Sequence, residues 1–293
     1  MERAERSQES VKRLLSQYGL RAKKSLGQHF LINKSVLHCI VSAAELTMED
    51  TVVEVGPGLG VLTRELAGQA RRVIAVEADA KLSSALGEII GAFPNISVIN
   101  SDILQTDPAS LLTSSGIELG TSSYKVVANI PYYITSPILR HFLEASLKPS
   151  LMVVMVQKEV GKAIVAQPGE MGILAVSVQL YGKPTIIDYV PARSFYPSPK
   201  VDSAILQIKL YEQPLVWVSE TGKFFEVVRA GFSAQRKQLR NSLAHGLGIS
   251  PQEAADIIEG AEIDHRRRAE TLNLEEWARI CEVVIDHENA IKA

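Results

Sequence analysis

The segment from residue 51 to residue 159 alternates short β-branched runs with amphipathic stretches, and this alternation constrains the fold most strongly. The expected strands are apolar along their whole length, which is typical of strands buried on both faces. Strand–helix repetition of this kind predicts an α/β fold with a parallel sheet covered by helices on both faces. The expected strands span residues 51–56, 71–79, 96–102, 124–133 and 151–159, and the expected helices span residues 60–69, 81–91 and 136–147.

The pattern changes on both sides of this segment. A helix is expected over residues 35–46, with Ser35 as a candidate N-cap. Two further strands, 184–190 and 202–210, are separated by a proline-bearing loop, which predicts antiparallel pairing late in the sheet. From residue 211 the pattern is helical throughout, and helices are expected over residues 220–246, 250–260 and 273–289.

These changes divide the chain into three expected parts. Residues 1–24 form a basic, helical N-terminal arm, and residues 25–212 form the α/β domain. Residues 213–293 form a small all-helical domain, because the change of pattern near residues 210–216 is the natural domain boundary.

Composition indicates a cytoplasmic protein without a membrane segment. The apolar run Leu151–Val156 is far shorter than the roughly 20 residues that span a bilayer. The N-terminus is charged from its second residue and lacks the apolar core of a secretory signal. Cys39 and Cys281 have no metal-like spacing, so we expect reduced thiols and no metal site.

A net charge of −2 hides three basic clusters. For any one cluster, solvated surface charge is an adequate interpretation. Three clusters on a nearly neutral chain also fit an anionic partner such as RNA. Their members are Arg13, Arg21, Lys23 and Lys24, then Arg229, Arg236, Lys237 and Arg240, and finally Arg266, Arg267 and Arg268.

Glycines follow the first expected strand in the pattern Gly56-x-Gly58-x-Gly60. They let the backbone turn sharply and approach a ligand where a Cβ would collide. The spacing differs from the G-x-G-x-x-G pattern of dinucleotide folds. A tight strand–helix turn without a ligand is the alternative interpretation.

Acidic residues end the next two expected strands. Glu77 lies 21 residues after Gly56, the position from which a carboxylate accepts hydrogen bonds from ribose hydroxyls. Asp102 can accept a hydrogen bond from the amine of an adenine, or can cap a helix. Together with the glycines, these two acidic residues predict a pocket for an adenosine that carries a group other than a pyrophosphate.

The fourth expected strand ends in Asn129-Ile130-Pro131-Tyr132. Asn129 offers an amide oxygen, and Ile130 offers a carbonyl whose direction is restricted by Pro131. Tyr132 adds a flat ring, so the stretch suits a planar base with an exocyclic amine. A proline turn with a core tyrosine would explain Pro131 but explains Asn129 poorly.

This set of motifs resembles the KsgA-type ribosomal RNA small-subunit adenine dimethyltransferases, a family of S-adenosylmethionine-dependent adenine-N6 methyltransferases. The similarity runs from about residue 19 to the C-terminus, and the family carries either Asn or His where His29 stands. The resemblance implies a Rossmann-like methyltransferase sheet with a helical C-terminal domain. The segments that carry it are SLGQHFLIN (25–33), VEVGPGLGVLT (53–63), VVANIPYYITSPIL (126–139), VQKEVGKAI (156–164), FYPSPKVDSAIL (195–206) and FSAQRKQLRNSL (232–243).

The resemblance implies a role for each matching residue toward S-adenosylmethionine, whose product is S-adenosylhomocysteine. His29 and Leu31 would close over the cofactor. Gly56 and Gly58 would pass under its methionine part, Glu77 would hold its ribose, and Asp102 its adenine. Asn129 would lie where cofactor and target base meet, joined in catalysis by Ile130 and Pro131. Tyr132 and Phe195 would sandwich the target adenine.

The implied substrate is a pair of adjacent adenosines in the 3′-terminal hairpin loop of 16S ribosomal RNA, within the assembling small subunit. The family adds two methyl groups to each adenosine, and the enzyme is expected to act as a monomer. The residues expected to contact RNA are Arg21, Lys23, Lys24, Lys200, Arg236, Lys237 and Arg240.

Three alternatives remain open at this point. An NAD(P)-dependent oxidoreductase could use Glu77. However, this chain lacks the glycine spacing that such an enzyme would have, and hydride transfer has no need for the Asn-Ile-Pro-Tyr stretch. A non-catalytic RNA-binding assembly factor would not need Asn129. An Erm-type methyltransferase of 23S ribosomal RNA would share the pocket, although the segments at 195–206 and 232–243 favour the small-subunit enzyme.

Overall fold

The computed structural model describes residues 2–23, 27–118, 123–234 and 236–292. By its internal contacts the chain forms two compact units, one of Met1–Gly161 with Pro184–Leu210 and one of Lys162–Lys183 with Tyr211–Ala293. Residues 162–183 thus group with the helical tail, although they were expected in the α/β domain. The functional boundaries at residues 24 and 212 stay a prediction.

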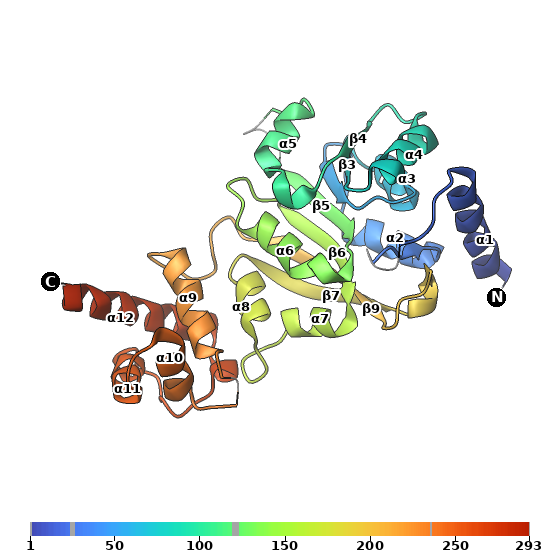
Figure 1. Ribbon diagram of the computed structural model, residues 1–293. Coiled ribbons are helices and arrows are strands. Elements are labelled where there is room, and N and C mark those ends of the chain that lie inside the picture. The colour runs from blue at the N-terminus through green and yellow to red at the C-terminus, as the bar shows by residue number, and fades with distance from the viewer. Residues whose placement is uncertain (1, 24–26, 119–122, 235, 293) are drawn as a thin grey trace. The chain divides into compact units, whose positions relative to one another are not determined.

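The first unit is built on a seven-stranded sheet with strand order β4-β3-β2-β5-β6-β9-β7 (Figure 1). The parallel pairs run from β4 to β6, and β9 is antiparallel to β6, so both expectations for the sheet are confirmed. The strands are β2 (Thr51–Val55), β3 (Arg72–Glu77), β4 (Ile96–Asn100), β5 (Tyr124–Asn129), β6 (Leu151–Gln157), β7 (Gly182–Val190) and β9 (Ser203–Leu210).

Helices cover both faces of the central strands. Every residue of β2 is buried, which requires cover on each face since successive side chains point to opposite sides. Apolar residues of α2 and α3 pack with Val52, Val127 and Val153 in one core cluster. The helices of this unit are α1 (Glu2–Gln17), α2 (Lys34–Ala43), α3 (Val61–Ala67), α4 (Ala80–Ile90), α5 (Pro108–Ser114) and α6 (Thr135–Leu143), and α7 (Lys158–Ile164) follows β6.

The order of the strands places a ligand crevice at β2. The chain adds β3 and β4 on one side of β2 and then returns to add β5 and β6 on the other. Where the strand order reverses in this way, loops diverge at the carboxyl ends of the two adjacent strands and leave a binding crevice. The motifs that follow β2 and β5 therefore face each other.

Three local expectations are wrong. The N-cap of α2 is Asn33 rather than Ser35, and its side chain accepts hydrogen bonds from the N–H groups of Ser35 and Val36. The strand expected to reach residue 133 ends at Asn129, since Pro131 has no N–H with which to continue a ladder. The helix expected over residues 220–246 is two helices, α9 (Thr221–Gly231) and α10 (Leu239–Leu247).

The helix α1 is packed against the first unit rather than extended from it as a free arm. Val11 and Leu15 are buried in a cluster with Phe30, Leu59 and Leu82. Apolar burial of this kind stabilises a helix that its own propensity would leave marginal.

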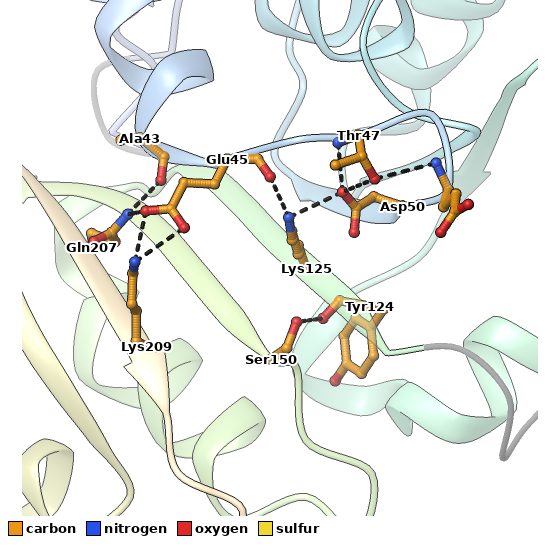
Figure 2. A network of polar contacts seen from close by, with 10 residues as sticks. Ala43, Glu45, Thr47, Asp50, Tyr124, Lys125, Ser150, Gln207 and Lys209 are labelled. Atoms are coloured by element: carbon orange, nitrogen blue, oxygen red, sulfur yellow. Dashed lines mark hydrogen bonds and ion pairs between the residues drawn. The ribbon is translucent and has the colours of Figure 1, made fainter.

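Figure 2 shows a polar network at the amino ends of the central strands. Lys125, at the start of β5, donates to the Glu45 carbonyl at 2.6 Å and contacts the Asp50 carboxylate at 3.0 Å. Glu45 has a left-handed backbone (φ 48°), and its carboxylate contacts Lys209 on β9 at 2.7 Å. The network therefore fastens the turn between α2 and β2 to two strands of the sheet.

Replacing Lys125 by methionine should lower the free energy of unfolding by about 2 kcal/mol, because it leaves the Asp50 charge without its cation in a site that is 14% exposed. Lys209→Met is the matched control. Its pair with Glu45 is half-exposed on both sides, so we expect a loss below about 1 kcal/mol. Urea denaturation of both variants at pH 7 measures the difference, and equal losses would contradict the assignment.

In the Lys125→Met variant, the free energy of unfolding should depend less on pH in the acidic range than it does in the wild type. Burial by itself raises the pKa of Asp50, but hydrogen bonds from Thr47 and Lys125 outweigh it and hold the pKa below its ordinary value. The resulting stability is present above the unfolded pKa of about 3.9 and is lost as the pH falls through the folded value. The wild-type and Lys125→Met curves should therefore converge on acidification.

The second unit is a helical bundle of α8 (Ile173–Gln179), α9, α10, α11 (Pro251–Gly260) and α12 (Leu274–Lys292). Ser250 and Glu253 form a capping box at the start of α11, with Pro251 in its first turn. Gly246 of α10 lies directly against the backbone of Ala230 on α9. In the described part of the chain, no helix is long and apolar enough to cross a membrane.

Candidate active site

The glycine turn after β2 adopts a conformation that other residues rarely reach. Gly56, Gly58 and Gly60 have φ values of 68°, 57° and 75°. A Cβ on Gly58 would lie 3.1 Å from the Phe30 ring, whereas a Cβ on Gly56 would meet no atom within 4 Å. The space above Gly56 is thus open, and the turn forms a cradle beneath it.

Glu77 ends β3 and turns its carboxylate toward this cradle. Its oxygens accept hydrogen bonds from the N–H groups of Gly58 at 3.2 Å and Asp79 at 3.0 Å. Burial raises the pKa of Glu77, and these hydrogen bonds partly offset the increase. A buried carboxylate with remaining acceptor capacity suits a pair of ligand hydroxyls.

Asp102 follows β4 and caps a short turn, which confirms one of the two interpretations left open by the sequence, whereas its contact with an adenine amine stays a prediction. Its side chain accepts a hydrogen bond from Leu104 N–H at 3.0 Å, which makes it the N-cap of a short 3₁₀ turn. It also lines the same pocket as the glycine turn. The cap fixes the carboxylate where an amine of a ligand could reach it.

One pocket unites all the residues predicted to bind the cofactor. It extends from the glycine turn to the segment before α2 and to the end of β5. The predicted residues that line it are His29, Leu31, Gly56, Gly58, Glu77, Asp102 and Asn129. Their sequence separation is large, so the strand order of the sheet is what brings them together.

Asn129, the last residue of β5, has an amide with a defined orientation. Its Nδ2 donates to the His29 carbonyl at 3.0 Å, so Oδ1 must face the other way. Among the described residues, nothing donates a hydrogen bond to Oδ1 or to the Ile130 carbonyl. Two hydrogen-bond acceptors, the Asn129 Oδ1 and the Ile130 carbonyl oxygen, are therefore available to a ligand at the carboxyl end of β5.

Tyr132 lies beside this pair without lining the cofactor pocket. Its hydroxyl contacts the Ser203 hydroxyl at 2.6 Å, and its ring is stacked near the His29 ring at a centroid distance of 5.9 Å. The His29 Nδ1 in turn contacts the Pro197 carbonyl at 2.6 Å. His29 thus links the segment before α2 to the loop after Phe195.

Phe195 is placed differently from the expectation of an open stacking ring. It lies in β8 (Phe195–Tyr196), which pairs with β1 (Phe30–Leu31), and it is 2% exposed within the core. A base could stack on Phe195 only after this ring is uncovered. The sandwich of adenine between Tyr132 and Phe195 stays a prediction.

One residue of the site, Glu54, was not predicted from the sequence. Glu54 lies within β2, is 1% exposed and lines the pocket. Burial, above all, and the nearby charge of Glu77 raise its pKa to about 8. The signal that could have revealed it is a charged residue inside the apolar run TVVEV.

The described residues predicted to bind RNA belong to both compact units, and their contact with RNA stays a prediction. Lys23 contacts Asp79 at 2.6 Å, and Arg240 lies half-buried with its guanidinium 3.4 Å from the His265 ring. Arg236 and Lys237 are exposed in the turn between α9 and α10 rather than on a helix. Arg21 and Lys200 are also exposed, and Lys24 lies outside the described residues.

The third basic cluster has carboxylate partners. Arg266 contacts Asp264, Arg267 contacts Glu276, and Arg268 lies 3.7 Å from Glu270. These ion pairs give the cluster a structural role in the connection to α12.

Among the described residues, no group of three or more His, Cys, Asp or Glu side chains is placed to hold a metal ion.

Comparison with known proteins decides the family. The model for ribosomal RNA adenine dimethylases matches residues 19–286. The chain belongs to the ribosomal RNA adenine dimethylase family. It is therefore a methyltransferase that modifies adenine in ribosomal RNA.

Relatives of this dimethylase are similar over nearly their whole length. "Ribosomal RNA small subunit methyltransferase A" of Dehalococcoides mccartyi is 51% identical, over 94% of this chain and 93% of the relative. The protein of the same name from Moorella thermoacetica is 44% identical over 91% and 94%.

Among solved structures, the 23S rRNA methyltransferase ErmE has a TM-score of 0.67 at 29% identity, over 87% of this chain and 99% of ErmE. A dimethyladenosine transferase from Plasmodium falciparum has a TM-score of 0.72 at 23% identity, over 89% of this chain and 98% of that protein, and shows the shared fold. The predicted methyltransferase fold is thus confirmed.

Proposed function

We propose that this dimethylase transfers methyl groups from S-adenosylmethionine to N6 of two adjacent adenosines in the 3′-terminal hairpin loop of 16S ribosomal RNA, within the assembling small subunit. The observation that carries the proposal is the convergence of Glu77, Asp102 and the Asn129 amide on one pocket. The names of the 51% and 44% identical relatives support the small-subunit substrate.

The pocket fits the cofactor. Glu77 would accept from the ribose hydroxyls and Asp102 from the adenine amine, while the open space above Gly56 would take the methionine part. When bound, S-adenosylmethionine supplies an electrophilic methyl group on a positively charged sulfur.

The protein's task is to prepare the acceptor nitrogen. The N6 lone pair of adenine is delocalised into the ring, which makes the amine a poor nucleophile. Asn129 Oδ1 and the Ile130 carbonyl would accept the two N6 hydrogens, favour a tetrahedral nitrogen and stabilise the positive charge that grows on it. Because that charge makes the N6 proton acidic after transfer, no side chain needs to act as a general base.

The target base must leave its stack to reach this site. Unstacking costs a few kcal/mol, and stacking on an aromatic ring returns about 1–3 kcal/mol per base. Tyr132 is half-buried beside Asn129 and offers such a ring. A loop adenosine is the cheaper target, since it is not paired in a duplex.

Methylation of isolated ribosomal subunits tests the proposal. With labelled S-adenosylmethionine, we expect label in the small subunit and N6,N6-dimethyladenosine after digestion of its RNA. Label in 23S ribosomal RNA would instead indicate the Erm-type specificity. RNA binding without any transfer would indicate an assembly factor, and sedimentation of the purified chain tests the proposed monomer.

A further inference from the structure

Tyr133 presents an exposed aromatic ring at the pocket, and the mechanism above has no use for it. Its side chain is 63% exposed and is among those that line the pocket. Its hydroxyl forms no hydrogen bond with any residue in the described part of the chain. Single exposed aromatic residues are common on protein surfaces, but this one lines the same pocket as Asn129, four residues before it.

Tyr132 and Tyr133 point to different sides of the turn that follows β5. Both belong to the 3₁₀ turn Tyr132–Ile134, in which successive side chains are about 120° apart. The Tyr132 hydroxyl contacts Ser203, at the start of β9, at 2.6 Å. The Tyr133 ring lies instead beside Gly27, where an added Cβ would be 3.6 Å from Tyr133 Cδ1. The Tyr132 ring is therefore fixed against the sheet, whereas the Tyr133 ring leaves most of its surface to solvent.

The strand order assigns Tyr133 to the acceptor side of the pocket. The residues proposed to hold the cofactor lie at the carboxyl ends of β2, β3 and β4, and they are Gly56, Glu77 and Asp102. Tyr133 follows β5, which lies on the opposite side of β2 from β3 and β4. Asn129, whose Oδ1 would accept from the target amine, ends the same strand. The Tyr133 ring is thus on the side from which the RNA would enter.

The charges around the pocket favour a base rather than a phosphate as the partner of this ring. Among the described lining residues there is no lysine or arginine, and the acidic ones are Glu54, Glu77, Asp79 and Asp102. A phosphate at this wall would therefore meet acidic side chains and no cation. Every nucleobase, in contrast, has a π-face that can stack on an aromatic ring.

We propose that Tyr133 stacks on the base next to the target adenosine while the target itself is held at Asn129. The inference rests on the proposed function, in which two adjacent adenosines are modified. Extrusion of one adenosine removes the stacking partner of its neighbour. The Tyr133 ring replaces that partner and so stabilises the extruded arrangement without touching a reacting atom.

Single-turnover transfer at saturating S-adenosylmethionine, measured against the concentration of small subunits, tests the inference. Tyr133→Ala should raise the half-saturating concentration of subunits about 5- to 100-fold, the range that corresponds to one base–aromatic stack. The maximal rate should stay within about twofold of the wild type, because an interaction made equally before and during transfer affects binding alone. An unchanged half-saturating concentration would overturn the inference.

Two further substitutions distinguish stacking from the other contributions of the side chain. Tyr133→Phe keeps the ring and should stay within about twofold of the wild-type half-saturating concentration. Tyr133→Leu keeps an apolar side chain without a π-face, so most of the loss seen with alanine should remain. Wild-type behaviour of the leucine variant, or equal losses for phenylalanine and alanine, would show that stacking is not the contribution.

Phe93→Ala is the matched control for the loss of an exposed ring. Phe93 is 36% exposed in the turn between α4 and β4, at the opposite edge of the sheet from the pocket. Its replacement should leave both the half-saturating concentration and the maximal rate unchanged. Since the Tyr133 side chain is largely exposed, its variants should also keep the wild-type urea midpoint.

Calorimetric titration with S-adenosylmethionine separates the acceptor side from the cofactor side. The dissociation constant should be the same for the wild type and Tyr133→Ala, and an increase as large as that in the half-saturating concentration would place the ring over the cofactor and overturn the inference. If the wild type transfers no label to the small subunit, the proposed function falls and this inference falls with it. If the wild type transfers label and Tyr133→Ala saturates at the same subunit concentration, only the role of Tyr133 falls.

Discussion

Asn129→Ala is expected to lower the rate of methyl transfer to the small subunit by at least a factor of about 10²–10³. The change removes the amide oxygen that would accept from N6, and it also removes the hydrogen bond from Nδ2 to the His29 carbonyl. Binding of ribosomal RNA should stay nearly intact, since Asn129 makes no phosphate contact in the proposed mechanism. Single-turnover transfer with labelled donor and filter binding of RNA measure the two quantities separately.

Asn95→Ala provides the matched control for the loss of an amide. Asn95 Nδ2 donates to the carbonyls of Ala67 and Ala70, at the amino end of β4 and away from the pocket. Its replacement should cost about 1 kcal/mol of stability and leave transfer by the folded protein unchanged. If Asn129→Ala retained wild-type transfer, the residue would lose its assigned role.

Gly246→Ala is expected to destabilise the helical unit by about 3 kcal/mol or more. A Cβ at this position would lie 2.3 Å from the Ala230 Cα and 2.8 Å from the Ala230 carbonyl oxygen. Overpacking commonly costs about 1–3 kcal/mol, and here relief requires movement of backbone rather than of a side chain. Urea denaturation followed by Trp277 fluorescence reports on this unit, because Trp277 is buried in its core.

Gly222→Ala is the control on the partner helix. A Cβ on Gly222 would meet no atom within 4 Å, so we expect no loss and a gain of up to about 1 kcal/mol from helix propensity. Cofactor binding should survive Gly246→Ala, because the pocket belongs to the other compact unit. An unchanged urea midpoint for Gly246→Ala would show that the helices can separate without cost.

The sheet, and the pocket lined by the residues predicted to bind the cofactor, were predictable because both depend on local patterns. Continuous apolar runs identify buried strands, and the residue after each run necessarily lies at the carboxyl edge of a parallel sheet. The strand order then assembles Gly56, Glu77, Asp102 and Asn129 without further information.

What could not be predicted depends on specific side-chain and strand contacts that hydrophobic periodicity does not reveal. The break between α9 and α10 is held by Ser242, whose hydroxyl donates to the Ala234 carbonyl, and by Ser233, whose hydroxyl donates to the Ser242 carbonyl. Residues 232–238 contain neither glycine nor proline, and the glycine at the break, Gly231, is the last residue of α9. Likewise, the burial of Phe195 follows from the pairing of β8 with β1, about 165 residues earlier in the chain.

The position of α1 ties the N-terminal segment to the wall of the pocket. Residues 2–17 precede the region matched by the family model, yet Val11 and Leu15 cover Phe30 and Leu59, which form part of the pocket wall. A shortened protein that starts at Tyr18 would keep the whole region matched by the family model and still expose the outer side of that wall. We therefore expect removal of residues 2–17 to weaken ligand binding in this pocket, although none of these residues lines it.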